Sequence, residues 1–280
     1  MKNNLDQFYT QEKVAKFCSD IVKAFFDISE YKILEPSAGE GVFLKFFNNF
    51  YACDIDPKND LIEKKDFLKD DIKDKLGNDK ILTIGNPPFG KRSKLAIEFI
   101  NKSFEYSDIV AFILPIHFLK YSAQYKIRND AKLICSELLD EDSFIYNGKN
   151  YSVRCCFQIW TLLDTEYKDL RIKESPVIKH DDFDMWQYNN TKLAEKYFDK
   201  TIYNWDFAVP RQGYKDYNIR ETDPNKMDKH TQWIFFKANN KEILERLMSL
   251  DFEKISKNNT STPGFGKADV IKEYNNKFKK

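Results

Sequence analysis

The residues best suited to chemistry in this chain are Asn86-Pro87-Pro88-Phe89, which directly follow the apolar run Ile81 to Ile84. That run is short, β-branched and closed by Gly85, so it predicts a buried strand of a covered parallel sheet. Such sheets bind ligands beyond the carboxyl ends of their strands, and Asn86 would therefore face a crevice. Because proline has no backbone N–H, the tetrapeptide predicts a stiff array of acceptors beside the flat ring of Phe89. This array suits an amino group attached to an aromatic ring.

A glycine bend follows a second predicted strand, Tyr31 to Glu35. In the stretch Pro36 to Gly41, the residues Gly39 and Gly41 let the backbone approach a ligand closely. The spacing lacks the third glycine of the dinucleotide fingerprint, so a pyrophosphate site is not favoured. The bend therefore predicts close backbone contact with a different small molecule, or a plain turn between strand and helix.

A carboxylate stands at the end of a third predicted strand, Phe50 to Cys53. An acidic residue at this place, such as Asp54, can accept hydrogen bonds from both hydroxyls of a ribose. Taken alone, an acid of this kind is more often a solvated surface charge. Because Asp54 follows the glycine bend along the sequence, the role of ribose ligand is favoured.

The N-terminal region predicts an amphipathic helix with Thr10 as its N-cap. The first turn of a helix presents unpaired N–H groups and a positive dipole end, so it can hold a carboxylate. The apolar residues that recur at helical spacing are Val14, Phe17, Cys18, Ile21, Val22 and Phe25.

Together these stretches resemble the motifs of the γ class of S-adenosylmethionine-dependent DNA amino methyltransferases, in the order of that class. Asn86-Pro87-Pro88-Phe89 resembles motif IV, and its Asn-Pro-Pro-Phe form favours adenine as the target. The other resemblances are Asp6 to Thr10 with motif X, Glu35 to Gly41 with motif I, Lys65 to Leu68 with motif III, Asp108 to Leu114 with motif VI, and Cys156 to Trp160 with motif VIII.

The resemblance implies a role for individual residues. Asn86, Pro87 and Phe89 would grip the target amine, and Phe157 would stack on the opposite face of the base, although a core-facing Phe157 is an equally good interpretation. The residues implied in binding S-adenosylmethionine are Tyr9, Thr10, Glu35, Ser37, Gly39, Gly41, Asp54, Asp66 and Phe67.

The resemblance also implies the fold: a class I methyltransferase, Rossmann-like, with a seven-stranded and mostly parallel sheet and helices on both faces. A chain of 280 residues can hold this fold and a second domain. We expect residues 1–165 to be the catalytic domain that binds S-adenosylmethionine. Residues 166–280 would form a smaller α+β region for target recognition, entered through a charged linker from Asp164 to Asp184.

Within that second region, basic and aromatic residues alternate between Arg211 and Arg220. Arg and Gln side chains read base edges and Lys reaches phosphates, so the candidates for DNA contact are Arg211, Gln212, Lys215 and Arg220. A solvated hairpin tip is the competing interpretation. Elsewhere we expect helices at Lys94 to Phe104, Thr191 to Phe198 and Lys241 to Leu250, strands at Tyr151 to Leu163 and Thr231 to Ala238, a tight turn at Asn147-Gly148, and a loop from Asn258 to Lys267.

Composition limits the function classes. Lys and Arg total 45 against 44 Asp and Glu, so any nucleic-acid surface must be a local patch. No apolar run spans a bilayer and no signal-peptide core follows Met1, which predicts a cytoplasmic, intracellular protein without a membrane partner. The three histidines are isolated and the five cysteines lack Cys-x-x-Cys spacing, which predicts reduced, mostly buried thiols and no metal site.

We therefore expect a DNA methyltransferase that transfers a methyl group from S-adenosylmethionine to N6 of an adenine flipped out of double-stranded DNA at a specific short site. RNA adenine, N4 of cytosine and protein glutamine are alternative targets, because the same acceptors fit their amines. A non-catalytic subunit that binds nucleic acid is the alternative from another class. A cognate restriction endonuclease as partner stays open.

Overall fold

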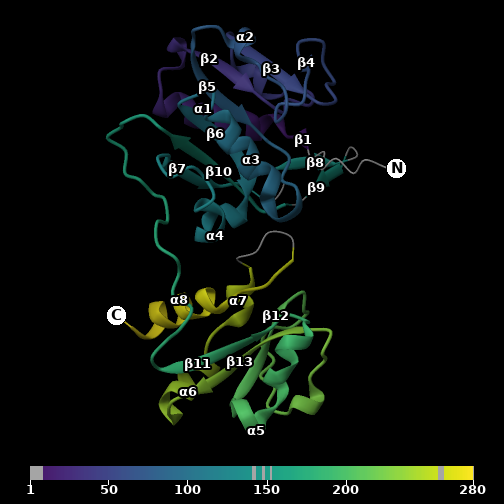
Figure 1. The fold of residues 1–280 in the computed structure, drawn as a ribbon, viewed down its shortest axis with the longest axis vertical. Coiled ribbons are helices and arrows are strands. Elements are labelled where there is room, and N and C mark those ends of the chain that lie inside the picture. The colour runs from purple at the N-terminus through teal and green to yellow at the C-terminus, as the bar shows by residue number, and fades with distance from the viewer. Residues whose placement is uncertain (1–8, 141–142, 147–148, 152, 258–261, 280) are drawn as a thin grey trace. The chain divides into compact units, whose positions relative to one another are not determined.

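The chain folds into two compact units, Met1–Glu174 and Ser175–Lys280, which are drawn in Figure 1. The turn expected at Asn147-Gly148 lies outside the described residues, as does the first part of the loop expected from Asn258 to Lys267. The computed structural model describes residues 9–140, 143–146, 149–151, 153–257 and 262–279.

A seven-stranded sheet forms the centre of the first unit. Its neighbouring strands pair in parallel, except that β10 lies antiparallel between β6 and β7. This confirms the predicted fold, a seven-stranded, Rossmann-like and mostly parallel sheet. In order across the sheet, the strands are β4 (Glu63–Lys64), β3 (Phe50–Asp54), β2 (Tyr31–Glu35), β5 (Lys80–Gly85), β6 (Ile109–Pro115), β10 (Cys155–Thr161) and β7 (Lys132–Leu138).

Both faces of this sheet are covered, as the continuous apolar strand sequences predict. Along β6, Val110 and Phe112 pack with α3 in one core cluster, whereas Ala111 and Ile113 pack with α1 in the other. The period of two in a strand produces this division. The helices of the unit are α1 (Glu12–Phe25), α2 (Lys73–Leu76), α3 (Lys94–Ser103) and α4 (Tyr121–Gln124), with 3₁₀ helices at Ile28–Glu30, Phe43–Phe46, Lys91–Ser93 and Ile116–Leu119.

A small antiparallel sheet joins the N-terminal segment to a distant hairpin. It consists of β1 (Tyr9–Thr10), β8 (Phe144–Tyr146) and β9 (Lys149–Tyr151), in the order β1-β8-β9. Thr10 pairs with Phe144. The long β-rich segment expected from Tyr151 to Leu163 is therefore divided between the end of β9 and β10 (Cys155–Thr161).

The first part of the expected linker belongs to the first unit. Arg171 donates four hydrogen bonds, of 2.7 to 3.1 Å, to backbone carbonyls. Its guanidinium also lies 5.6 Å from the ring centroid of Trp160. Asp169 accepts from the backbone N–H of Leu133 at 3.1 Å. These contacts hold the segment after β10 against the sheet. The acceptors of Arg171 are the carbonyls of Gln124, Ile127, Arg128 and Ala131.

The second unit is built on a three-stranded antiparallel sheet in the order β11-β13-β12. Side chains of β13 alternate between two core clusters, with Ile234 and Phe236 in one and Trp233 and Phe235 in the other. The strands are β11 (Phe183–Tyr188), β12 (Phe207–Gln212) and β13 (Gln232–Ala238); the helices are α5 (Lys200–Tyr203), α6 (Lys241–Met248), α7 (Phe252–Ser256) and α8 (Lys267–Phe278), with 3₁₀ helices at Lys192–Phe198 and Pro224–Lys226.

All five cysteines are buried and free, in agreement with the reduced, mostly buried thiols that the sequence predicts. Burial raises the pKa of the Cys53 thiol to about 12, which keeps it protonated. No helix in the described part of the chain combines the length and apolar character that crossing a membrane requires.

Candidate active site

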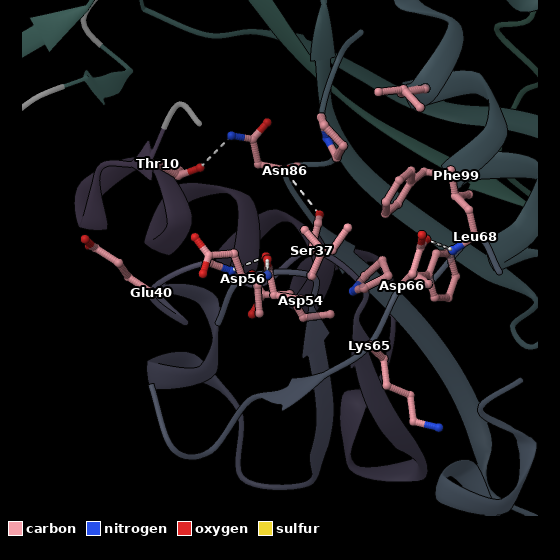
Figure 2. Close-up of a pocket in the computed structure, with 18 of the residues that line it drawn as sticks. Thr10, Ser37, Glu40, Asp54, Asp56, Lys65, Asp66, Leu68, Asn86 and Phe99 are labelled. Atoms are coloured by element: carbon pink, nitrogen blue, oxygen red, sulfur yellow. Dashed lines mark hydrogen bonds between the residues drawn. The ribbon is translucent and has the colours of Figure 1, made fainter. Parts of the chain in front are cut away.

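Three segments meet at one edge of the large sheet, because they follow the parallel neighbours β3, β2 and β5. The hydroxyl of Ser37, after β2, donates to the backbone carbonyl of Asn86, after β5, at 3.3 Å. The backbone N–H of Gly39 donates to Oδ2 of Asp54, at the end of β3, at 2.8 Å. Figure 2 shows the contact between Ser37 and Asn86. The glycine bend, the carboxylate and the Asn-Pro-Pro-Phe segment therefore lie together.

These segments surround a cavity of about 600 Å³, within the range of small-molecule sites. Most residues that the sequence singles out for cofactor binding line it, and Asn86 lines it with them. The predicted residues in its wall are Tyr9, Thr10, Glu35, Ser37, Gly39, Asp54, Asp66, Phe67 and Asn86. Pro88 of the Asn-Pro-Pro-Phe segment also lines it, and lining residues that the sequence did not indicate include Gly90, Lys91, Leu95 and Phe99.

The glycine bend needs glycine at two positions. Gly39 has φ of +54°, and a Cβ there would lie 3.2 Å from a ring carbon of Tyr9. Gly41 has φ of +77°, and a Cβ there would lie 3.0 Å from a methyl carbon of Leu44. L-amino acids adopt such φ values at a cost, so both positions favour glycine. Gly39 borders the cavity, whereas Gly41 shapes the bend behind it.

Glu35 is a buried acid in the wall of the cavity. Only 2% of its surface is exposed. Its Oε2 atom has no hydrogen-bond partner among the described residues. Burial, and to a smaller extent the neighbouring charge of Asp54, raises the pKa of Glu35 well above its usual range. A buried carboxyl with an unpaired oxygen on a cavity wall is suited to a cationic ligand.

Acidic side chains outnumber basic ones around this cavity. Five acids and three lysines line it. Asp54 also accepts from the backbone N–H of Asp56 at 2.8 Å, and Asp66 forms an ion pair with Lys69 at 2.7 Å. Within the described residues, no cluster of three or more metal-ligating side chains occurs. The lining acids are Glu35, Glu40, Asp54, Asp56 and Asp66, and the lysines are Lys65, Lys69 and Lys91.

Phe67 lies at the edge of the cavity and is nearly buried. Its ring centroid lies 5.3 Å from that of Phe99 and 6.1 Å from that of Tyr106. The ring is therefore part of the core that supports the cavity wall. A contact between Phe67 and a cofactor ring stays a prediction.

The Asn-Pro-Pro-Phe segment divides between cavity and core. Asn86 and Pro88 line the cavity. Pro87 is buried, and Phe89 packs partly against the core cluster on the α1 side. The side-chain Nδ2 of Asn86 donates to the hydroxyl of Thr10 at 3.1 Å, across 76 positions of sequence. Asn86 therefore contacts the segment after β2 through Ser37 and the N-terminal segment through Thr10.

Thr10 is not the N-cap of α1, so that prediction is wrong. The helix begins at Glu12, and its N-cap is Gln11, whose backbone is extended and whose side chain makes no capping hydrogen bond. Thr10 instead forms part of β1, and its hydroxyl contacts Asn86. Because this partner follows β5, 76 positions along the chain, no local pattern around Thr10 could have revealed it.

The stacking role predicted for Phe157 is also wrong. Its side chain has 0% exposed surface and belongs to the core cluster on the α1 side. In β10 it pairs with Ile113 of β6 and Glu137 of β7, and it lies inside a sheet that is covered on both faces. Neither face of its ring can receive a base.

In the second unit, two of the four residues predicted to contact DNA are engaged internally. Arg211 donates to the carbonyl of Phe265 at 2.9 Å, and burial lowers its pKa. Arg220 donates to the carbonyl of Leu250 at 2.8 Å and lies 4.5 Å from the ring centroid of Phe252. These internal contacts speak against the predicted DNA contact of both arginines. Gln212 and Lys215 are exposed, and their contact with DNA stays a prediction.

Comparison with known proteins gives likenesses of fold. No protein-family model matches the chain, and no curated protein matches it. A candidate RNA methyltransferase from Pyrococcus horikoshii shares 16% identity at a TM-score of 0.45, covering 56% of this chain and 87% of its own. The modification subunit of a candidate type I restriction enzyme from Vibrio vulnificus shares 16% identity at a TM-score of 0.42, covering 57% of this chain and 45% of its own. A Thermoplasma acidophilum protein shares 16% identity at a TM-score of 0.42, covering 54% of this chain and 86% of its own.

Proposed function

We propose that this chain is an S-adenosylmethionine-dependent methyltransferase that acts on N6 of a flipped-out adenine in DNA. One observation carries the proposal: Asn86 and the glycine bend at Gly39 line the same cavity. A methyl donor and an acceptor amine must come within bond-forming distance, and a shared cavity meets that requirement.

The residues of the cavity fit S-adenosylmethionine. The cofactor carries a sulfonium and an ammonium group, which suit the acid-rich wall and the buried Glu35. The glycine bend would lie against its methionine part, Asp54 would accept from its ribose hydroxyls, and Asp66 would accept from its adenine amino group. Asp54 and Asp66 would exchange their present hydrogen bonds for these contacts. When bound, the cofactor supplies an electrophilic methyl group.

The acceptors at Asn86 and Pro87 would activate the target amine. The lone pair of an exocyclic amine is delocalised into the ring, which makes the nitrogen a weak nucleophile. Hydrogen bonds from the amine to the Asn86 oxygen and the Pro87 carbonyl favour a tetrahedral nitrogen and stabilise the positive charge that develops there. The nitrogen would form its bond to the methyl carbon as the carbon–sulfur bond of the sulfonium breaks, which leaves a neutral thioether. The methylated nitrogen then releases a proton to water, so no strong base is needed.

The base must leave the duplex to reach this cavity. Flipping costs a few kcal/mol, and stacking on an aromatic ring offsets about 1–3 kcal/mol of it. Phe89, half-buried beside Asn86, is the remaining candidate for that stacking contact. Gln212 and Lys215 are the exposed residues of the second unit that we propose for DNA contact. We include a cognate restriction endonuclease, as a partner of this chain, in the same proposal.

The test is transfer of a radiolabelled methyl group to DNA, RNA and protein, followed by nucleoside and amino-acid analysis. We expect label in N6-methyladenine from double-stranded DNA. Asn86→Ala should lower kcat by about 10²- to 10³-fold, because it removes an acceptor at the reacting nitrogen. Asn78→Ala, at an exposed position of the same unit, is the matched control and should leave kcat unchanged.

Each other outcome identifies an alternative. Label in RNA, in N4-methylcytosine or in methylglutamine would reassign the substrate and keep the chemistry. An Asn86→Ala protein with the activity of the wild type would refute the role of Asn86. Binding of nucleic acid without any transfer by the wild type would support a non-catalytic subunit.

A further inference from the structure

The hydrogen bond between Asn86 and Thr10 joins two backbones that are each fixed by other contacts. Thr10 pairs with Phe144 of β8, and the next residue, Gln11, donates its N–H to the carbonyl of Ser143 at 3.1 Å. Phe144 and Ser143 are both fully buried. The hydroxyl of Thr10 is therefore held in place by a sheet that is independent of β5.

The backbone of Asn86 is held in the same way. It follows β5 directly, and its carbonyl accepts from Ser37. Pro87 comes next and restricts the conformation of the residue before it. The final torsion of an Asn side chain is broad and roughly two-fold, so the amide can present either end. In the structure Nδ2 faces the hydroxyl of Thr10, and this contact helps to hold the amide in that orientation (Figure 2).

The two ends of the Asn86 amide differ in chemistry. The oxygen accepts hydrogen bonds, whereas the nitrogen only donates. A target amine also donates, so an amide turned by 180° would place donor against donor. We infer that Thr10 is a positioning residue, whose hydroxyl binds Nδ2 of Asn86 and so directs the amide oxygen to the substrate amine. This inference rests on the proposed function of Asn86.

A purely structural role for Thr10 makes different predictions. The pairing of β1 with β8 uses the backbone of Thr10 and needs no hydroxyl. A hydroxyl that only filled space could be replaced by a methyl group without effect. A hydroxyl that bound the cofactor would change cofactor affinity. A positioning hydroxyl changes the rate of the chemical step and leaves affinity alone.

The experiment compares Thr10→Val with Thr10→Ser in the full-length protein. Val keeps the shape of Thr and removes the acceptor, whereas Ser keeps the acceptor. We expect Thr10→Val to lower kcat about tenfold, equivalent to about 1.4 kcal/mol. The Kd for S-adenosylmethionine and the KM for the methyl acceptor should stay within about twofold of the wild type, because less than about 0.4 kcal/mol is lost from either. Thr10→Ser should restore kcat.

Thr165→Val is the matched control. The hydroxyl of Thr165 has no hydrogen-bond partner among the described residues, so its removal should leave kcat and both affinities unchanged. Thr10→Val with wild-type kcat would overturn the inference. So would a loss of cofactor affinity in Thr10→Val, or a Thr10→Ser protein as slow as Thr10→Val.

A second readout separates this inference from the proposed function. The side-chain NH₂ resonances of Asn86 can be assigned by their loss in Asn86→Ala, using ¹⁵N-labelled protein without substrate. We expect them to shift in Thr10→Val and to keep their wild-type positions in Thr10→Ser and Thr165→Val. If the wild type transfers no methyl group, the proposed function fails while this shift still tests the contact. Unchanged resonances in Thr10→Val would refute the contact itself.

Discussion

Replacing Glu35 with Gln should stabilise the first unit and weaken its binding of S-adenosylmethionine. Glu35 is 2% exposed, and its Oε2 has no partner among the described residues. A buried polar group without a partner costs about 1–3 kcal/mol, and a charged group costs more. Gln keeps the shape without the charge, so we expect the free energy of unfolding at pH 8 to rise by about 1–3 kcal/mol. At about 2–4 °C per kcal/mol, Tm should rise accordingly.

The raised pKa of Glu35 determines how the stability gain of Glu35→Gln changes with pH. Burial raises the pKa of Glu35 above its ordinary value of 4.5. The folded protein therefore holds a proton that the unfolded chain has released, and stability falls as the pH rises from 4.5 through the raised pKa. The stability gain of Glu35→Gln should be present at pH 8 and should disappear below pH 4.5, where both states are protonated.

Calorimetry measures both the stability of Glu35→Gln and its affinity for the cofactor. The cationic cofactor would bind the deprotonated form of Glu35, and loss of this charge-assisted contact should raise Kd by about 10- to 100-fold, equivalent to about 1.4–2.8 kcal/mol. Glu40→Gln makes the same change of charge at an exposed position of the cavity rim and should alter stability and Kd little. A Glu35→Gln protein that is less stable than the wild type at pH 8, or that binds the cofactor equally well, would refute this reasoning.

Three further substitutions test the site and its support. Gly39→Ala should weaken cofactor binding measured by calorimetry, because φ of +54° and a Cβ at 3.2 Å from Tyr9 distort the bend; unchanged affinity would contradict this. Phe157→Ala should lower the free energy of unfolding in urea by about 3–5 kcal/mol, as expected of a fully buried ring. A change in kinetic constants without that loss would restore its stacking role. Arg171→Met should cost at least about 2 kcal/mol in the same assay, since four carbonyls lose their donor; equal stability would show that these bonds contribute little.

The sheet and its ligand edge were predictable because their signals are local. Ile81 to Ile84 is a short β-branched run, and the structure extends it by one residue at each end. Tyr31 to Glu35 is found as predicted. Parallel strands end at one edge, so the polar residues after each strand had to meet there. This reasoning brought the glycine bend, Asp54 and Asn86 together from sequence alone.

The errors concern partners that lie far apart in the sequence. Thr10 fits an N-cap pattern, but its hydroxyl is taken by a residue 76 positions away. Arg211 and Arg220 lie in a stretch with the composition of a contact loop, yet they donate to the carbonyls of Phe265, just before α8, and Leu250, between α6 and α7. Alternation along β10 could not show that both of its faces are covered, which buries Phe157. Side-chain partners of this kind are set by tertiary packing.

The place of β10 in the large sheet has a consequence for synthesis on the ribosome. β10 is the last strand of the sheet to be translated, yet it lies between β6 and β7. Until Thr161 has left the exit tunnel, β6 and β7 each present an unpaired apolar edge to the cell. A nascent chain that stalls between β7 and β10 would therefore be prone to aggregation and a natural client for chaperones, whereas one that has passed this point can close its sheet.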